Sequence, residues 1–203
     1  MKIVHLASTP STQDVARDLD VGSAVIADHQ TAGRGRLGRA WEAPPGTALL
    51  ASFVMPASPL ASLAAGVAAA HACGPSCRLK WPNDVLLGGA KLAGILAELH
   101  DDRVIVGIGV NLTWAPPGAA MLGAATDRDT LLERLVADLR RWFAAADAEV
   151  LAAWRGRADT LGRTVRVELP NDGFEGLAED IADDGSLIVA GRRVAAGDVI
   201  HLR

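Results

Sequence analysis

The chain has 203 residues, of which 50% are hydrophobic and 22% are charged, and its formal net charge is −4 at pH 7. This composition is ordinary for a globular protein with a substantial core, and it excludes disorder as a description of the whole chain. The negative net charge argues against a protein that mainly coats nucleic acid, because neutralising phosphates requires many clustered lysine and arginine side chains.

Targeting signals are missing from the N-terminal residues of this sequence. The first six residues run straight into polar positions, without the long apolar core of a signal peptide. The most apolar segment, residues 60–72, is too short to span a bilayer. We therefore expect a cytoplasmic protein with no membrane partner. Cys73 and Cys77 are expected to be reduced thiols, because two cysteines without further ligands make a weak metal site.

The first half of the chain alternates short strands with helices. Hydroxyl side chains before residue 13 can cap a helix, and Ser58-Pro59 is typical of the start of another. Continuous apolar runs between glycines predict buried strands. We expect strands at residues 2–7, 24–28 and 47–55, and helices at residues 11–20 and 58–72.

Tight turns dominate the middle of the chain. Pro82 breaks any helix and forces an extended or turned backbone at Trp81. Gly88-Gly89 predicts a hairpin turn, and consecutive strands joined by such turns pair in antiparallel fashion. Apolar residues at helical spacing follow. We expect strands at residues 91–100 and 103–112, a helix beginning with a Thr130–Glu133 capping box, and a second helix carrying Val150, Leu151 and Trp154.

The pattern changes again beyond residues 155–162. Short alternating segments are separated by turn signals at residues 171–173, 184–185 and 196–197. Several short strands at this spacing predict a small β-barrel of about 40 residues.

Residues 30–41 are the most unusual stretch of the sequence. Three glycines alternate with three arginines, and no acidic residue lies among them. Glycine lets the backbone approach a ligand closely, and each guanidinium can bind a carboxylate or phosphate through two hydrogen bonds. The stretch therefore predicts an anion-binding loop, with a solvated basic loop or a disordered nucleic-acid-binding segment as the alternatives.

Five polar or glycine-rich motifs occur in a fixed order along the chain. They are Ser11-Thr12-Gln13, the stretch from Gln30 through Gly33-Arg34-Gly35-Arg36-Leu37-Gly38-Arg39-Ala40-Trp41, then Lys80-Trp81-Pro82-Asn83-Asp84, Lys91-Leu92-Ala93-Gly94, and Gly107-Ile108-Gly109-Val110-Asn111. This series resembles the biotin protein ligases, or biotin–[acetyl-CoA-carboxylase] ligases, over essentially the whole chain. The resemblance implies an α+β fold of the class II aminoacyl-tRNA synthetase and biotin ligase type. A mixed, largely antiparallel sheet flanked by helices would form a catalytic domain at residues 1–158, and residues 162–203 would form a small barrel like a Src-homology-3 domain.

The activity that the resemblance implies has two steps. ATP with Mg²⁺ activates biotin as biotinyl-5′-AMP, and the biotinyl group then passes to a lysine of the biotin carboxyl carrier domain of a carboxylase. No tightly bound prosthetic group is expected, and a monomer or homodimer is equally compatible with the sequence. Because the first predicted strand begins near Met1, we expect the short form of the family, without an N-terminal DNA-binding domain and without a DNA partner.

The same resemblance assigns roles to individual residues. Two anions, the biotin carboxylate and the α-phosphate, must approach each other, so cations are required between them. By resemblance, the catalytic residues are Arg36, Lys91 and Arg39, the magnesium ligand is Asp84, and Arg34 orders the loop. The expected biotin-binding residues are Ser11, Thr12, Gln30, Gly33, Arg34, Arg36, Trp41, Lys91, Gly94, Gly107 and Gly109. The expected ATP-binding residues are Arg36, Arg39, Trp41, Lys80, Asn83, Lys91 and Asn111.

Two alternative functions stay open from the sequence. A lipoate or octanoate ligase would share the fold and the acyl-transfer chemistry, although its glycine loop and lysine motif look different. A nucleic-acid-binding module would use the Arg-Gly loop, but the acidic net charge and the lack of aromatic residues between the arginines disfavour it.

Overall fold

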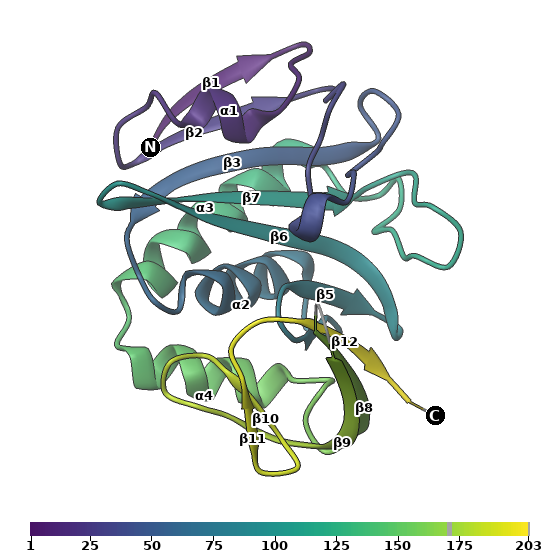
Figure 1. Cartoon of the computed structure of the whole chain (residues 1–203). Coiled ribbons are helices and arrows are strands. Elements are labelled where there is room, and N and C mark those ends of the chain that lie inside the picture. The colour runs from purple at the N-terminus through teal and green to yellow at the C-terminus, as the bar shows by residue number, and fades with distance from the viewer. Residues whose placement is uncertain (170–171, 203) are drawn as a thin grey trace.

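The structure, a computed structural model, describes residues 1–169 and 172–202 and contains two β-sheets with helices packed against them (Figure 1). The larger sheet has seven strands in the order β1-β2-β3-β7-β6-β5-β4. β1 and β2 pair in parallel and every other pair is antiparallel, so the predicted mixed, largely antiparallel sheet is confirmed. Its strands are β1 (Lys2–Leu6), β2 (Ser23–Ala27), β3 (Ala48–Pro56), β4 (Arg78–Lys80), β5 (Asp84–Leu87), β6 (Ala90–His100) and β7 (Arg103–Asn111).

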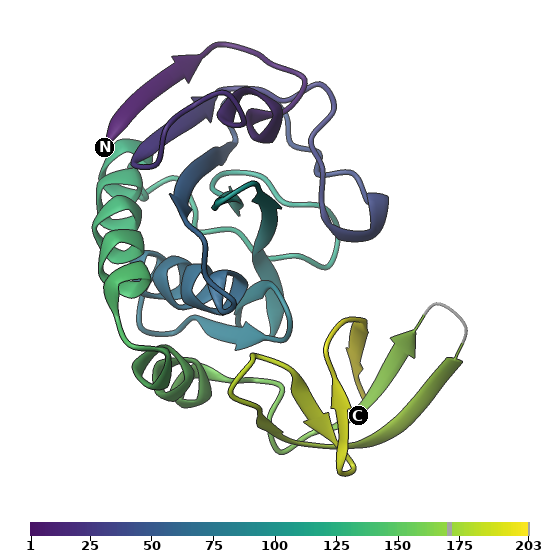
Figure 2. The ribbon, with the colours of Figure 1, turned by 60° about the vertical axis from the view of Figure 1, so that its left-hand side comes forward.

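The two faces of this sheet pack against different helices, as the side chains of strand β3 show. Side chains alternate between the faces of a strand, and Leu49, Phe53 and Met55 belong to the main core beneath helices α2 (Ala61–Cys73) and α3 (Arg128–Ala144). Val54 points to the opposite face, into a small cluster beneath α1 (Thr12–Ala16). The view in Figure 2 separates α1 from the layer of α2 and α3. Even-numbered β3 residues therefore face the side that carries α1.

Helix α2 is the buried helix that its apolar sequence predicts. Its side chains are buried nearly all round, because α3 and α4 (Asp147–Arg157) pack on it from outside while the sheet covers the other side. The helix begins at Ala61, two residues later than the predicted first helical position at Pro59. Ser58 Oγ instead accepts a hydrogen bond from the backbone N–H of Leu60, at 3.2 Å.

Two other predicted helix boundaries are also corrected. Helix α1 ends at Ala16, where the predicted helix continued to residue 20. Helix α3 is capped by Asp127, whose carboxylate accepts a hydrogen bond from the backbone N–H of Thr130 at 2.7 Å. Thr130 therefore occupies the third helical position, and the predicted Thr130–Glu133 capping box does not start the helix. Within the described residues, no helix is long and apolar enough to cross a bilayer.

The C-terminal strands form a second sheet, in the order β11-β10-β9-β8-β12. They are β8 (Thr164–Leu169), β9 (Asp172–Ile181), β10 (Leu187–Val189), β11 (Arg192–Val194) and β12 (Asp198–His201). Among the described strands β11 and β12 do not pair with each other, so the sheet is open where the sequence predicted a closed barrel. Of the predicted turns, the one at 171–173 falls partly outside the described residues, and those at 184–185 and 196–197 join β9 to β10 and β11 to β12.

Candidate active site

A cavity of about 270 Å³ lies on the α1 side of the larger sheet and is closed at one end by the C-terminal sheet. Most of the residues predicted for the site line it: Ser11, Thr12, Gln30, Arg34, Arg36, Arg39, Trp41, Lys80, Asn83, Asp84, Lys91, Gly94, Gly107 and Gly109. Gly33 and Asn111 are not among the lining residues. Segments that are far apart in the sequence thus line the same cavity.

One end of the cavity is polar and buried. The backbone N–H and the hydroxyl of Thr12 both donate to Gln30 Oε1, at 2.7 and 2.9 Å. The Thr12 hydroxyl also lies 2.7 Å from the hydroxyl of Ser52 on β3. Ser11 is 1% exposed, and its Oγ has no hydrogen-bond partner among the described residues. A buried hydroxyl of this kind costs free energy unless a ligand or water satisfies it, so this end is built to receive a polar group.

The indole of Trp41 forms one wall of the cavity and packs flat on two glycines. Gly94 on β6 and Gly109 on β7 are directly paired across the sheet. A Cβ at Gly94 would lie 2.9 Å from the ring, and a Cβ at Gly109 would lie 2.4 Å from it. These glycines are therefore required by the ring itself, which any other side chain would displace.

Gly107 serves another side chain on the same face of β7. A Cβ there would lie 3.0 Å from Oε1 of Gln13. The Gln13 amide donates to Oε2 of Glu98 at 3.0 Å. The glycine gives room to a buried amide that also lines the cavity and that the sequence assigned to no role.

The loop of residues 33–41 is folded back on itself as a compact hairpin. The backbone N–H of Gly35 donates to the carbonyl of Arg39 at 2.7 Å, and that of Trp41 donates to the carbonyl of Gly33 at 2.9 Å. A Cβ at Gly33 would lie 2.4 Å from the carbonyl oxygen of Trp41, so this glycine permits the closure of the hairpin. Between Gly35 and Arg39, the short 3₁₀ helix η1 (Arg36–Gly38) forms the turn of the hairpin.

Arg34 ties this hairpin to helix α1. Its guanidinium donates two hydrogen bonds of 2.8 Å to the two carboxylate oxygens of Asp14, and these bonds lower the pKa of Asp14. Glu98 on β6 lies 3.9 Å from the same guanidinium. Arg34 therefore connects the hairpin to α1 and β6 through acidic partners.

Four cations converge on the other end of the cavity: Arg36, Arg39, Lys80 and Lys91. Burial lowers the pKa of Lys80, and the charges of Lys91 and Arg39 add to this effect. Burial also lowers the pKa of Arg36 against the opposing attraction of Asp84. Both pKa shifts arise chiefly from burial, with smaller contributions from neighbouring positive charges, and an anion bound there would offset this cost.

Asp84 is the acidic partner of Lys91 among these cations. Nζ of Lys91 lies 2.6 Å from Oδ1 of Asp84, an ion pair whose geometry is not that of a hydrogen bond. Nζ also lies 5.7 Å from the centre of the Trp41 ring. Lys91 is thus held between an acid and an aromatic face at the middle of the cavity.

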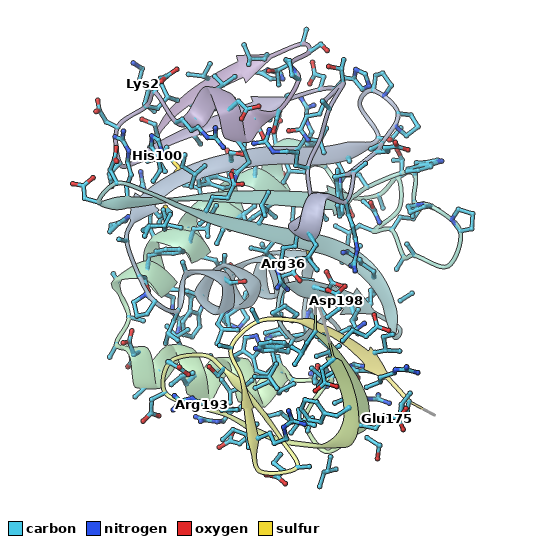
Figure 3. The ribbon with its side chains drawn as sticks, viewed as in Figure 1. Lys2, Arg36, His100, Glu175, Arg193 and Asp198 are labelled. Carbon is cyan, nitrogen blue, oxygen red and sulfur yellow. The ribbon has the colours of Figure 1, made fainter. Side chains whose placement is uncertain are left out.

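The start of β12 contributes residues to the site that no sequence motif predicted. Asp198 forms an ion pair with Arg39, and the carbonyl of Gly197 accepts a hydrogen bond of 3.5 Å from Arg36. Figure 3 shows Arg36 and Asp198 next to each other between the two sheets. Glu168 on β8, directly opposite Asp198 in the sheet, also lines the cavity. An Ala-Gly-Asp sequence reads only as a turn, so no local signal could have identified these contributions.

The two predicted asparagines occupy different positions. Asn83 lines the cavity, donates to the carbonyl of Ile95 at 2.8 Å and accepts from Arg36 at 3.4 Å. Asn111 donates to the carbonyl of Ala120 at 2.9 Å and so fixes the loop after β7. Its ATP-binding role stays a prediction, with one of its two amide N–H donors already engaged.

Comparison with known proteins identifies the family. Residues 6–112 match the model of the biotin/lipoate A/B protein ligase family, and residues 160–202 match the biotin protein ligase C-terminal domain. A biotin–[acetyl-CoA-carboxylase] ligase of Mycobacterium tuberculosis is 42% identical, covering 92% of this chain and 81% of that protein. The ligase of the same name from Paracoccus denitrificans is 38% identical, covering 93% and 95%.

A solved structure agrees with these relatives. The biotin protein ligase from Aquifex aeolicus in complex with biotin and ATP superposes with a TM-score of 0.87 at 26% identity, covering 100% of this chain and 99% of that one. Because it covers the whole chain, the match extends over both sheets. This chain therefore belongs to the biotin/lipoate protein ligase family and, within it, to the biotin protein ligases.

Proposed function

We propose that this protein activates biotin with ATP as biotinyl-5′-AMP and transfers the biotinyl group to a lysine of a biotin carboxyl carrier domain. The observation that supports the proposal is the arrangement of side chains around the cavity. One end is polar and buried and contains an unsatisfied hydroxyl, the indole of Trp41 forms a wall, and four cationic side chains lie at the other end. This arrangement suits a molecule with a polar ring, an apolar tail and a terminal carboxylate that must meet a triphosphate.

The polar end suits the ureido group of biotin, which both donates and accepts hydrogen bonds. Ser11 offers a free hydroxyl, and the amide N–H groups of Gln30 remain available beside its engaged oxygen. The ring and tail of biotin would then lie along Trp41. Lipoate carries a dithiolane ring without such donors and acceptors, so it would leave these polar atoms unpaired. This contrast favours biotin over lipoate or octanoate.

The cationic end suits the reacting groups. The biotin carboxylate attacks the α-phosphorus of ATP and pyrophosphate leaves, which requires two anions to approach each other. Arg36 and Lys91 would neutralise the carboxylate and the α-phosphate, and Arg39 would bind the leaving phosphates. Each charge-assisted hydrogen bond contributes about 1.5–3 kcal/mol, and about 1.4 kcal/mol corresponds to a tenfold change in rate.

Asp84 fits a magnesium ligand in this scheme. Its Oδ1 is buried and already lies 2.6 Å from the cationic Nζ of Lys91, so the carboxylate occupies a position that attracts cations. Mg²⁺ commonly binds one or two carboxylates together with substrate phosphates, and the described residues offer no cluster of three or more metal-binding side chains. Asp84 and the triphosphate would hold the ion, which would supply further neutralisation of the phosphate charge.

The second step requires an acceptor lysine to reach the adenylate. Its neutral amine attacks the acyl carbon and AMP leaves. The hairpin of residues 33–41 would cover the reactive anhydride and exclude water until the carrier arrives. We also propose that residues 1–158 form the catalytic domain and residues 162–203 a separate small domain.

A pyrophosphate-release assay with ATP and Mg²⁺ tests this function. Release should depend on biotin and not on lipoate. Stimulation of release by lipoate and not by biotin would assign the protein as a lipoate ligase. If neither acid stimulates release, the ligase assignment is wrong.

A further inference from the structure

The turn that carries Lys80, Asn83 and Asp84 is attached to the C-terminal part of the chain. Between β4 and β5, the indole N–H of Trp81 donates to the carbonyl of Gly185 at 3.0 Å. The backbone N–H of Trp81 donates to the hydroxyl of Thr160 at 2.9 Å. Thr160 is 0% exposed and lies in the connection between α4 and β8. Thr160 lies outside the motifs identified in the sequence, yet it holds Trp81 within the Lys80-Trp81-Pro82-Asn83-Asp84 motif.

The hydroxyl of Thr160 belongs to a directional chain of polar contacts. Its oxygen accepts from Trp81, so its own proton is free to be donated to Nε2 of His201, 3.1 Å away. This leaves the proton of a neutral imidazole on Nδ1, which lies 3.4 Å from Oδ2 of Asp159. The backbone N–H of Asp159 in turn donates to the carbonyl of Leu79 at 2.7 Å, and so closes the chain onto β4.

The surroundings of His201 favour the neutral form that this chain requires. Burial lowers the pKa of His201, and the positive charge of Lys80 lowers it further. His201 lies on β12, the strand whose first residue, Asp198, pairs with Arg39. One short strand therefore contacts both the loop and the turn at the cationic end of the cavity.

We propose that Thr160 is a positioning residue for the ATP half of the site. Its hydroxyl, oriented by His201, fixes the backbone at Trp81 and through it the placement of Lys80 and Asp84. The inference rests on the proposed function, because it concerns how that site holds ATP. The polar end is independent of it, since the side-chain hydrogen bonds of Thr12 and Gln30 join α1, β3 and the adjoining loop.

Loss of the hydroxyl should affect the two substrates differently. Without it the buried N–H of Trp81 has no acceptor, and the turn must shift to find one. A displacement of about 1 Å can cost roughly a hundredfold in rate when it misplaces reacting groups. We expect T160V to raise the KM for ATP about tenfold or more, equivalent to about 1.4 kcal/mol, with the KM for biotin changed less than about twofold.

The test compares T160V with T160S and with T164V in the biotin-dependent pyrophosphate-release assay. Serine keeps the hydroxyl and should restore the wild-type KM for ATP. Thr164 is exposed at the start of β8, four residues after Thr160, so T164V controls for a threonine-to-valine change in the same part of the chain. Calorimetric titration of ATP and of biotin separately should show the same selective loss in T160V.

Three results would overturn the proposal: an unchanged ATP KM in folded T160V, an equal rise in both KM values, or a failure of T160S to rescue. If T160V shows no cooperative thermal transition, H201F decides, because it removes the acceptor of the Thr160 proton. A severalfold rise of the KM for ATP in H201F would support the proposed role of the Thr160–His201 contact, and an unchanged KM would overturn it. An inactive wild-type protein would instead refute the proposed function.

Discussion

The contact between Trp41 and Gly109 offers a quantitative test of how the cavity wall is built. In Gly109→Ala, the new Cβ would lie 2.4 Å from Cε2 of the indole and 2.7 and 2.8 Å from Cζ2 and Nε1. Ordinary contact between carbon atoms begins near 3.5 Å, so the ring must retreat by about 1 Å. Overpacking of this kind costs about 1–3 kcal/mol of unfolding free energy. We also expect biotin affinity to fall roughly tenfold as the wall moves, or about 1.4 kcal/mol.

A double-mutant cycle assigns this cost to the ring. Trp41→Ala removes the atoms that the new methyl group would meet, so Gly109→Ala should be nearly neutral in that background, with a coupling energy of about 1 kcal/mol or more. Gly156→Ala is the matched control, because a Cβ at Gly156 in α4 would meet no heavy atom within 4 Å. It should stabilise the protein by about 0.5–1 kcal/mol.

Denaturant unfolding and calorimetric titration with biotin provide the measurements. The reasoning is refuted if Gly109→Ala costs the same free energy with Trp41 present and absent, because the indole would then not be the group displaced. A neutral Gly109→Ala in the wild-type background would refute it as well.

Three further predictions concern the loop and the C-terminal sheet. Asp198→Asn should weaken the hold on Arg39 and slow single-turnover pyrophosphate release with little change in biotin affinity, and an unchanged rate would contradict the role given to β12. Asp14→Asn should leave stability within about 1 kcal/mol, because Arg34 and Asp14 are partly exposed, yet it should speed proteolysis within residues 33–41. The hairpin anchor is wrong if cleavage is unchanged. Because the folded-state pKa of His201 is lowered, its contribution to stability is present above its unfolded pKa near 6.5 and is lost as the pH falls below that value. The melting temperature of H201Q should therefore decline less steeply than that of the wild type between about pH 7 and pH 5, and parallel declines would contradict the shift.

Local sequence determined much of the larger sheet and of the cavity lining. The hairpin between β5 and β6 was predictable because Gly88 and Gly89 both adopt positive φ, at 60° and 82°. The lining residues that were predicted each belong to a short motif through which the sequence resembles the biotin protein ligases. Within one such motif, Gly107 and Gly109 alternate with Ile108 and so must face together.

Features that depend on contacts between distant segments were not predictable. The biotin-binding role of Gly94 and Gly109 stays a prediction, but their close contact with Trp41, more than fifty positions earlier in the chain, could not be predicted. A glycine in a strand indicates that something approaches closely without saying what. The contribution of Asp198 to the site was not predictable for the same reason, because only the packing of the second sheet brings it to Arg39.

Helix boundaries failed for a local reason. Thr130 and Asp127 are both good capping residues, and the sequence offers no means to rank them. The structure selects Asp127, whose side chain reaches the N–H of Thr130. The open form of the C-terminal sheet likewise follows from which strands pair, a property that turn spacing does not specify.

Intact-mass analysis of a carrier domain tests the central claim most directly. The protein would be incubated with ATP, Mg²⁺, biotin and a biotin carboxyl carrier domain, and the modified lysine would be located by peptide sequencing. We predict one biotinyl group on one lysine, with the rate reduced more than tenfold in Arg36→Ala and Lys91→Ala while both variants keep their melting temperature. An unmodified carrier, a carrier modified with lipoate in place of biotin, or full activity in both variants would contradict the account.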